Sequence, residues 1–171
     1  MILGLARGSV SLVPHQIEWA QAFERERLLL RNALGDTARA IAQVGSTAVP
    51  GLLAKPIIDI AIAVETFDHI RDWPPALAVH GYAYFGDRQG WRDHFFAKGP
   101  DALRTCYLHV VEQGGERWRN YLRFRDRLRA SPELRQEYES LKLAAAAANP
   151  TRDAYTAAKN DFIAGVLGTR R

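Results

Sequence analysis

The sequence predicts an α/β fold, more closely an α+β arrangement in which a mixed sheet core is followed by C-terminal helices. Short runs rich in β-branched and aromatic residues, separated by glycine turns, continue as far as Glu112 and are typical of strands. From Glu116 onward, apolar residues recur at helical spacing instead. With 171 residues, 47% of them apolar, the chain suits one domain with a proper core.

The first elements alternate between strand and helix. Residues 11–13 form a short strand that ends at a proline, and residues 15–34 form a helix that ends before Gly35. Residues 38–44 form the next strand. The run 57–64 is dense in β-branched residues and too apolar for the edge of a sheet, so we expect it to be an interior strand.

Later elements are separated by glycine and proline signals. Three further strands are expected, at residues 82–85, 93–97 and 105–111. Residues 67–79 have a helical pattern that two prolines interrupt, so its limits stay open. Three helices follow residue 116, separated by Ser-Pro at 131 and Asn-Pro at 149.

Composition limits the possible partners and compartments. The net charge of +4 and pI of about 9.5 fit an anionic ligand better than a dedicated nucleic-acid surface. Cys106 is the single cysteine, so no internal disulfide can form and a reducing cytoplasm fits. No run approaches the ~20 apolar residues of a membrane span. We therefore expect one cytoplasmic domain over residues 1–171, with frayed ends at 1–9 and 168–171 and an undetermined oligomeric state.

The most informative segment is the turn after the strand that ends at Val44. Gly45-Ser46 offers flexible backbone N–H groups and a hydroxyl to an anion, and Thr47 follows with a second hydroxyl. Asp59 is a lone carboxylate in an apolar strand, which is costly without a partner such as a metal ion. The pair predicts a phosphate cradle beside a metal-binding strand, against the alternatives of an ordinary turn and a hydrogen-bonded buried aspartate.

These residues also carry a family resemblance. The run GSTAVPGLLAKPIIDI closely resembles the signature of the GrpB-like proteins. The match continues through HFFAKG, LHVVE, FRDRLR and AYTAAKNDFI, and it extends from Val10 to Leu167. The resemblance implies the nucleotidyltransferase superfold, in which a Gly-Ser loop precedes a strand that bears Asp-x-Asp or Asp-x-Glu.

The resemblance also implies a ligand and a reaction. Active enzymes of the superfold use both acids to hold Mg²⁺ against the phosphates of a nucleoside triphosphate, and Asp59 matches the first of these acids. The second position is Ala61, which alternation places on the same face of the strand. Two hypotheses follow. The chain is a Mg²⁺-dependent nucleotidyltransferase-like protein with an unknown acceptor, or a non-catalytic nucleotide- or CoA-binding accessory module, since GrpB-like segments also occur fused to dephospho-coenzyme A kinase.

The strand at 105–111 is the expected source of a replacement for the missing acid. His109 could act as a general base, a metal ligand or a phosphate donor, or could be a histidine that merely satisfies one hydrogen bond. Glu112 ends the same strand and carries a carboxylate. If the protein is an enzyme, His109 or Glu112 should lie near Asp59.

Basic residues are the remaining candidates for phosphate contacts. Four of them are assigned to a phosphorylated ligand: Lys55, Arg92, Lys98 and Lys159. Arginines from 119 to 129 recur along one predicted helix and could bind RNA. A solvated helix face is the simpler interpretation of this stripe. We therefore expect no nucleic-acid partner and no membrane partner.

Overall fold

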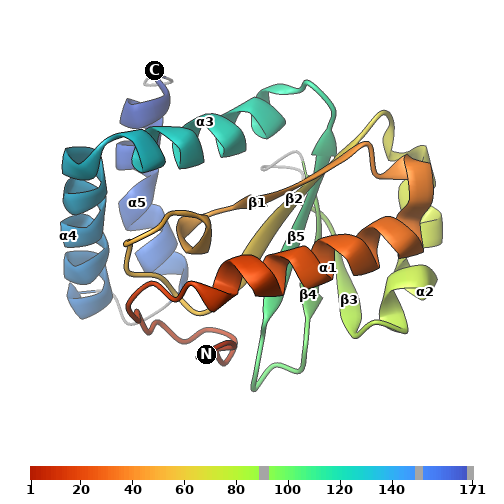
Figure 1. The fold of residues 1–171 in the computed structure, drawn as a ribbon, viewed down its shortest axis with the longest axis horizontal. Helices are drawn as coiled ribbons and strands as arrows, with labels where there is room; N and C mark the ends of the chain where they lie inside the picture. The colour runs from red at the N-terminus through yellow and green to blue at the C-terminus, as the bar shows by residue number, and fades with distance from the viewer. Residues whose placement is uncertain (89–92, 149–151, 169–171) are drawn as a thin grey trace.

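The computed structural model describes residues 1–88, 93–148 and 152–168. Across these residues the chain forms one mixed sheet with helices packed around it (Figure 1). Helix α1 runs across one face of the sheet, α2 lies at the end of the same face, and α4 and α5 stand side by side beyond the β1–β2 end. The predicted order, a sheet half followed by a helical half, is confirmed.

The sheet contains five strands in the described residues, in the order β1-β2-β5-β4-β3. Their bounds are β1 Ala40–Val44, β2 Ile58–Val64, β3 Tyr82–Arg88, β4 Asp93–Lys98 and β5 Cys106–Glu112. Strands β2 and β5 are parallel, and the other neighbouring pairs are antiparallel. Strand β2 is an interior strand, as its apolar sequence predicts.

The helices have the bounds α1 Glu18–Leu34, α2 Trp73–Ala78, α3 Glu116–Ala130, α4 Pro132–Ala148 and α5 Arg152–Leu167. Short 3-10 helices occupy Gly35–Thr37, Ser46–Ala48 and Phe67–Asp72. The two prolines expected to interrupt the segment 67–79 instead lie at the first positions of α2. Proline fits there because its missing N–H has no partner in the first turn of a helix.

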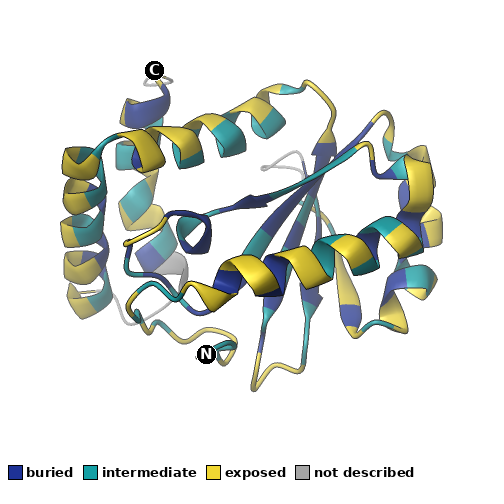
Figure 2. Cartoon of the chain, viewed as in Figure 1, coloured by how far each residue is buried: buried dark blue, intermediate teal, exposed yellow. Residues whose placement is uncertain are grey.

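Strand β2 is buried along almost its whole length (Figure 2), and its side chains alternate between a core face and a second face. Ile58, Ile60 and Ile62 point toward α1, where they join Trp19 and Leu30 in the main hydrophobic cluster. The residues between them, including Asp59, point to the opposite face. We call this opposite face of the sheet the site face.

A second apolar cluster attaches the helical half to the turn after β1. Val49 and Leu52 pack with Leu128 of α3 and Tyr138 of α4. Polar contacts add to this packing, because Arg129 of α3 donates to the Ala48 carbonyl at 2.8 Å. The helices are therefore fixed against the segment that carries Gly45-Ser46.

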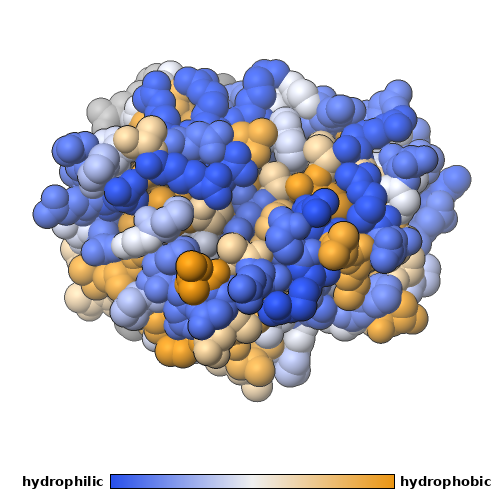
Figure 3. Space-filling view, in the orientation of Figure 1, coloured by the Kyte–Doolittle hydropathy of each residue, from blue (hydrophilic) through white to orange (hydrophobic). Residues whose placement is uncertain are grey.

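The N-terminal residues, expected to be frayed, are hydrogen-bonded to the body of the protein. Gly4 donates its backbone N–H to the Pro56 carbonyl at 2.7 Å, and Leu5 donates to the Arg104 carbonyl at 3.0 Å. No helix in the described part of the chain combines the length and apolar character that crossing a membrane requires. The face that carries α1 is mainly hydrophilic with scattered apolar side chains (Figure 3).

Candidate functional site

The turn after β1 lies directly against Asp59. Val44 pairs with Asp59 across the β1–β2 ladder, and Gly45 follows with φ 68°. A Cβ atom at Gly45 would lie 2.5 Å from the Asp59 Oδ2 atom. Only glycine fits this position, since it combines a left-handed backbone with the absence of a side chain. The Gly-Ser motif therefore places the backbone of the turn directly against the carboxylate of Asp59.

His109 lies beside Asp59 on the site face. The Nε2 atom of His109 is 3.5 Å from the Oδ1 atom of Asp59. In the parallel β2–β5 ladder, His109 is the direct neighbour of Ala61, the position at which the superfold usually has a second acid. The structure thus places an imidazole next to the missing carboxylate, so His109 is the residue of strand β5 that meets the expectation of proximity.

A buried carboxylate, Asp93, holds the other side of the imidazole. The Nδ1 atom of His109 is 3.1 Å from Asp93 Oδ2, and the Arg88 Nε atom donates to Asp93 Oδ1 at 2.8 Å. Tyr121 of α3 donates to the same carboxylate at 3.4 Å. Burial raises the pKa of Asp93, but the hydrogen bonds from His109 and Arg88 outweigh it, so the pKa lies below its ordinary value.

Asp93 and Arg88 both lie at the Nδ1 atom of His109. This atom is 3.1 Å from Asp93 Oδ2, which can only accept a hydrogen bond, and 2.9 Å from Arg88 Nη2, which can only donate one. The Nε2 atom on the other side of the ring faces Asp59. A histidine oriented by a buried carboxylate is an arrangement suited to general-base chemistry.

A β-bulge brings Arg88 to this network. The register between β3 and β4 shifts between Tyr84 and Asp87, and Gly86 within the shift has φ 91°. A bulge inserts one extra residue into a strand, so side chains beyond it change face. Because of this change, both Phe85 and Arg88 contact Phe95, a residue of the site face.

Lys142 of α4 reaches the site from the helical half. Its side chain is 1% exposed, and its Nζ atom lies 3.4 Å from the Ser46 hydroxyl and donates to the Leu53 carbonyl. Burial is the main reason that the pKa of Lys142 is lowered to about 7; the charge of Lys159 contributes to this shift, and Glu139 opposes it. A buried ammonium group beside a hydroxyl is a suitable contact for an anionic ligand.

Two further lysines lie close to Lys142. The Nζ atoms of Lys55 and Lys159 lie 4.4 Å and 4.2 Å from the centre of the Tyr155 ring. Of the two, Lys159 acts electrostatically on Lys142, and Lys55 lies two residues after Leu53, whose carbonyl Lys142 contacts. We call Lys55, Lys142 and Lys159 the lysine cluster. It concentrates positive charge on the side of Ser46 that faces α4 and α5.

Several predicted site residues lie elsewhere. Glu112 is exposed and pairs opposite Val64, at the far end of β2 from Asp59, so the alternative that it lies near Asp59 is wrong. The assignment of Lys98 to the cradle is also wrong, since it forms an ion pair with Glu26 of α1 on the opposite face of the sheet.

The assignment of Thr47 to the ligand is also wrong. Thr47 is 2% exposed, and its hydroxyl donates to the Ile57 carbonyl at 3.3 Å, so it stabilises the turn from inside. Arg92 lies outside the described residues.

The arginine stripe of α3 is used largely for internal hydrogen bonds. Arg125 donates to the Gln43 carbonyl at 3.0 Å, and Arg127 donates to the Val166 carbonyl at 2.8 Å. With Arg129 on Ala48, these contacts join α3 to β1, the turn and α5. The arginine stripe therefore holds α3 against its neighbours. Neither RNA binding nor a wholly solvated helix face predicts this role.

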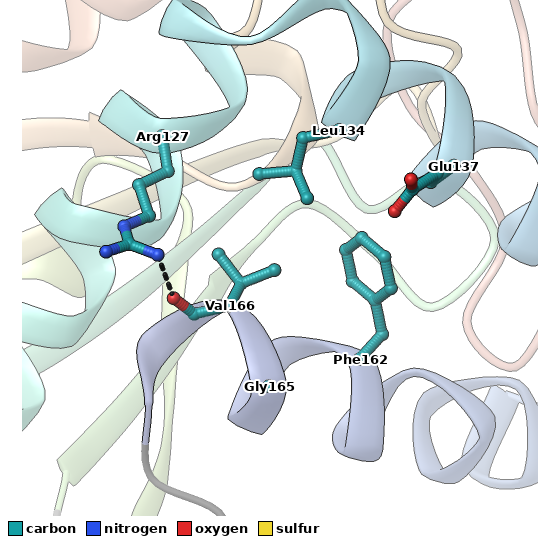
Figure 4. A pocket seen from close by; sticks show the side chains of 6 residues that line it. All are labelled: Arg127, Leu134, Glu137, Phe162, Gly165 and Val166. Atoms are coloured by element: carbon teal, nitrogen blue, oxygen red, sulfur yellow. Dashed lines mark hydrogen bonds between the residues drawn. The ribbon is translucent and has the colours of Figure 1, made fainter.

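Residues of α3, α4 and α5 line a groove (Figure 4). Its lining residues are Arg127, Leu134, Glu137, Phe162, Gly165 and Val166. It contains neither Asp59, His109 nor any member of the lysine cluster, so it is not the predicted site.

The superfold implies a bound magnesium ion, and few side chains near the turn could coordinate it. Ala61 offers no oxygen, and Asp93 is engaged by Arg88 and His109. Within the described residues, no group of three or more His, Cys, Asp or Glu side chains is placed to hold a metal ion. Mg²⁺ is often bound by one or two carboxylates together with substrate phosphates. Asp59 therefore fits the ion only in combination with a phosphorylated ligand.

Comparison with known proteins identifies the family. The family model for GrpB protein matches residues 9–169. The chain belongs to the GrpB family. The glutamate-rich protein GrpB of Alkalihalophilus pseudofirmus is 37% identical over 171 residues, which cover 97% of this chain and 98% of the relative. The predicted family resemblance is confirmed.

Solved structures confirm the fold of this GrpB-family chain. The crystal structure of GrpB from Enterococcus faecalis matches with a TM-score of 0.84 and 30% identity, over 92% of this chain and 95% of that one. The Cid1 poly(U) polymerase matches with a TM-score of 0.54 and 14% identity, over 76% of this chain and 42% of that one. At such low identity the second likeness shows the fold alone, which is the predicted nucleotidyltransferase-like fold.

Sequence reasoning missed Asp93, Arg88 and Lys142. Asp93 begins a predicted strand, and nothing local shows that it meets His109 across the β4–β5 ladder. Lys142 did leave a signal, because it lies four residues after Tyr138, on the stripe of the helix that faces the core. A lysine on an apolar helical stripe indicates a buried charge that needs a partner.

Proposed function

We propose that this protein binds a nucleoside triphosphate, or a related phosphorylated small molecule, and transfers a nucleotidyl group to an acceptor hydroxyl or phosphate. One observation carries the proposal. Asp59 and His109 lie 3.5 Å apart on the same face of the sheet, and Asp59 lies against the Gly45-Ser46 turn. The fold shared with Cid1, whose solved structure holds MgATP, makes nucleoside triphosphates the ligands to test first.

The phosphates of the ligand would lie between the turn and the lysine cluster. Ser46 would donate a hydrogen bond from its hydroxyl to a phosphate oxygen. Lys142, whose Nζ atom lies 3.4 Å from that hydroxyl, would donate a further hydrogen bond to the ligand. Lys55 and Lys159 would neutralise the outer phosphates. Asp59, together with phosphate oxygens, would hold Mg²⁺, which supplies charge neutralisation at the phosphate that is attacked.

His109 would act as the general base for a hydroxyl acceptor. Its Nε2 atom would take the proton as the acceptor oxygen forms a bond to the α-phosphorus. The bond from that phosphorus to the bridging oxygen would break, and pyrophosphate would leave with the electron pair toward the lysine cluster. Positioning and electrostatics supply most of the catalysis in phosphoryl transfer, so few side chains are needed.

Thermal unfolding with ATP, GTP, CTP and UTP, each with and without Mg²⁺, tests the binding step. We expect at least one triphosphate to raise the melting temperature in a Mg²⁺-dependent way, because a ligand that binds only the folded state stabilises it. Lys142→Met should abolish most of this shift, whereas Lys98→Met on the other face should retain it. No shift with any triphosphate would contradict the proposal.

A second candidate function is a binding module that has lost the chemistry. Ala61, together with the small metal-binding donor set in the described residues, favours it. This alternative expects triphosphate or CoA-like binding without pyrophosphate release, and an affinity that Asp59→Asn leaves nearly intact. A pyrophosphate-release assay on the parent and Asp59→Asn separates the two, because a turnover that the substitution abolishes would exclude the binding module.

A further inference from the structure

Aromatic side chains continue the site face beyond His109. Phe85, Phe95 and Tyr107 come from three neighbouring strands, and we call them the aromatic row. The Phe95 ring centre lies 6.0 Å from that of Phe85 and 5.3 Å from that of Tyr107. Tyr107 is the direct neighbour of Asp59 in the β2–β5 ladder. The row therefore begins next to the proposed catalytic pair.

The aromatic row is open to solvent at its far end. Phe85 is 42% exposed and Tyr107 is partly exposed, whereas Phe95 between them is buried. In the described chain, the helix packed on β3 is α2, which joins the core of the opposite face through Trp73 and Leu77. Guanidinium groups flank the rings, since Arg104 lies 5.1 Å from the centre of Phe85 and Arg88 lies 4.3 Å from the centre of Phe95. Exposed aromatic rings combined with arginines are the surface type on which nucleobases stack.

The direction of the proposed transfer assigns an occupant to this surface. In phosphoryl transfer the attacking and leaving oxygens lie roughly in line. The leaving pyrophosphate would face the lysine cluster, beyond the β1–β2 turn. The acceptor must therefore approach from the other side of Asp59, across β5 and β4. His109, the proposed base, lies on that same side.

We infer that the aromatic row binds the acceptor, and that the acceptor is a nucleotide whose base stacks on Tyr107. This assignment of the acceptor rests on the proposed function, because the transfer direction defines which side is free. Strands in a sheet are about 4.8 Å apart, so Phe85 lies roughly 14 Å from Asp59, three strands away. A single base would reach Tyr107, and a second base of an RNA end would reach Phe85.

Titration of the protein with AMP, with the dinucleotide ApA and with inorganic tripolyphosphate tests this inference. Tyr107→Leu keeps apolar volume but removes the π surface, and should weaken AMP binding about tenfold. Phe85→Leu is the second variant. Because Phe85 is exposed, this substitution should leave the fold intact. Tyr84→Leu is the matched control, since Tyr84 is 37% exposed on the same strand but faces the opposite side.

The two nucleotide sources give different results. For an RNA end, ApA binds more tightly than AMP, and Phe85→Leu removes the gain. For a free nucleotide, ApA gains nothing over AMP, and Tyr107→Leu alone weakens binding. Equal affinities in the parent, Tyr107→Leu and Phe85→Leu, or no binding of AMP and ApA at millimolar concentration, would overturn the inference.

Tripolyphosphate separates this inference from the proposed function, because it has phosphates and no ring. If tripolyphosphate fails to bind while Tyr107→Leu weakens AMP binding, the transfer proposal falls and the aromatic row remains a nucleotide site. If tripolyphosphate binds through Lys142 and AMP binding is insensitive to Tyr107, the aromatic row is excluded and the phosphate site stands.

Discussion

At the scale of single residues, Gly45 is the position where the backbone and the site depend on each other most directly. Its φ of 68° and the 2.5 Å distance that would separate a Cβ atom from Asp59 Oδ2 are two separate obstacles to any side chain. Gly51 presents only the first obstacle, since its φ is 80° and no atom lies within 4 Å of the Cβ position. The two glycines thus allow backbone strain to be separated from contact with the carboxylate.

We predict that Gly45→Ala lowers the free energy of unfolding by more than Gly51→Ala does. Backbone strain costs on the order of 1 kcal/mol in both variants, and displacement of Asp59 adds to the cost at Gly45 alone. Urea unfolding of the two variants and the parent measures the difference. Equal losses would mean that the close approach to Asp59 carries no energetic cost.

Asp93 is the residue on which the orientation of His109 depends. Its side chain is fully buried and accepts hydrogen bonds from Arg88, His109 and Tyr121. Asp93→Asn should lower the free energy of unfolding by about 3 kcal/mol, because it leaves Arg88 without its carboxylate. Nitrogen NMR should also show a change in the signal of the His109 Nδ1 atom, because that atom loses its contact with a carboxylate. Asp87→Asn, an exposed aspartate on β3, is the control and should change neither.

The pH dependence of the same pair follows from the lowered pKa of Asp93. A carboxyl whose folded pKa lies below its unfolded value contributes stability above the unfolded value, and this contribution is lost as the pH falls through the folded pKa. The parent should therefore lose more stability than Asp93→Asn as the pH is lowered below about 4. A stability difference between them that does not change with pH in this range would contradict the ionised, paired state of Asp93.

At the scale of elements, helix α4 carries a buried amine, Lys142, into an otherwise apolar contact with the turn. Its pKa of about 7 in the folded protein lies below the unfolded value of 10.5. The folded state then disfavours the charged form. The free-energy cost of burying the charged amine is fully present below about pH 7. It disappears as the pH rises to the pKa of the unfolded chain.

We predict that the parent gains stability relative to Lys142→Met as the pH rises from 7 to 10.5. At pH 6 the variant should be the more stable protein by a few kcal/mol, on the order expected for a shift of this kind. Urea unfolding at a series of pH values measures the difference between the two. A constant difference across the series would show that Lys142 titrates normally.

The elements themselves were largely predictable, and the exceptions have local physical causes. Apolar spacing predicts α1 and α3, and the β-branched run predicts β2. The β3 strand extends to Arg88 because a bulge at Gly86 absorbs the irregular residues that indicate a turn. The prolines of α2 were wrongly predicted to be breaks, although proline at the start of a helix is favourable.

At the scale of the whole molecule, the site depends on strand order, which a sequence does not contain. Gly45, Ser46 and Asp59 were predictable because one short loop joins them. Asp59 and His109 meet only because β2 and β5 are neighbours and parallel, which the chain between them does not determine. The same argument explains the error at Lys98, since one residue of register along β4 decides which face a side chain occupies.

The two halves of the chain meet at the turn after β1, so binding there should involve both. We predict that tripolyphosphate slows amide hydrogen exchange in the turn at Ser46–Ala48, in α4 near Lys142 and in α5 near Lys159. Ligand contacts raise the free energy of local opening, and these segments surround Ser46. Exchange in α1, which packs on the other face, should stay within about twofold of its rate in the free protein. Protection confined to the exposed arginines of α3 would instead locate the anion on that helix and remove the argument for the lysine cluster.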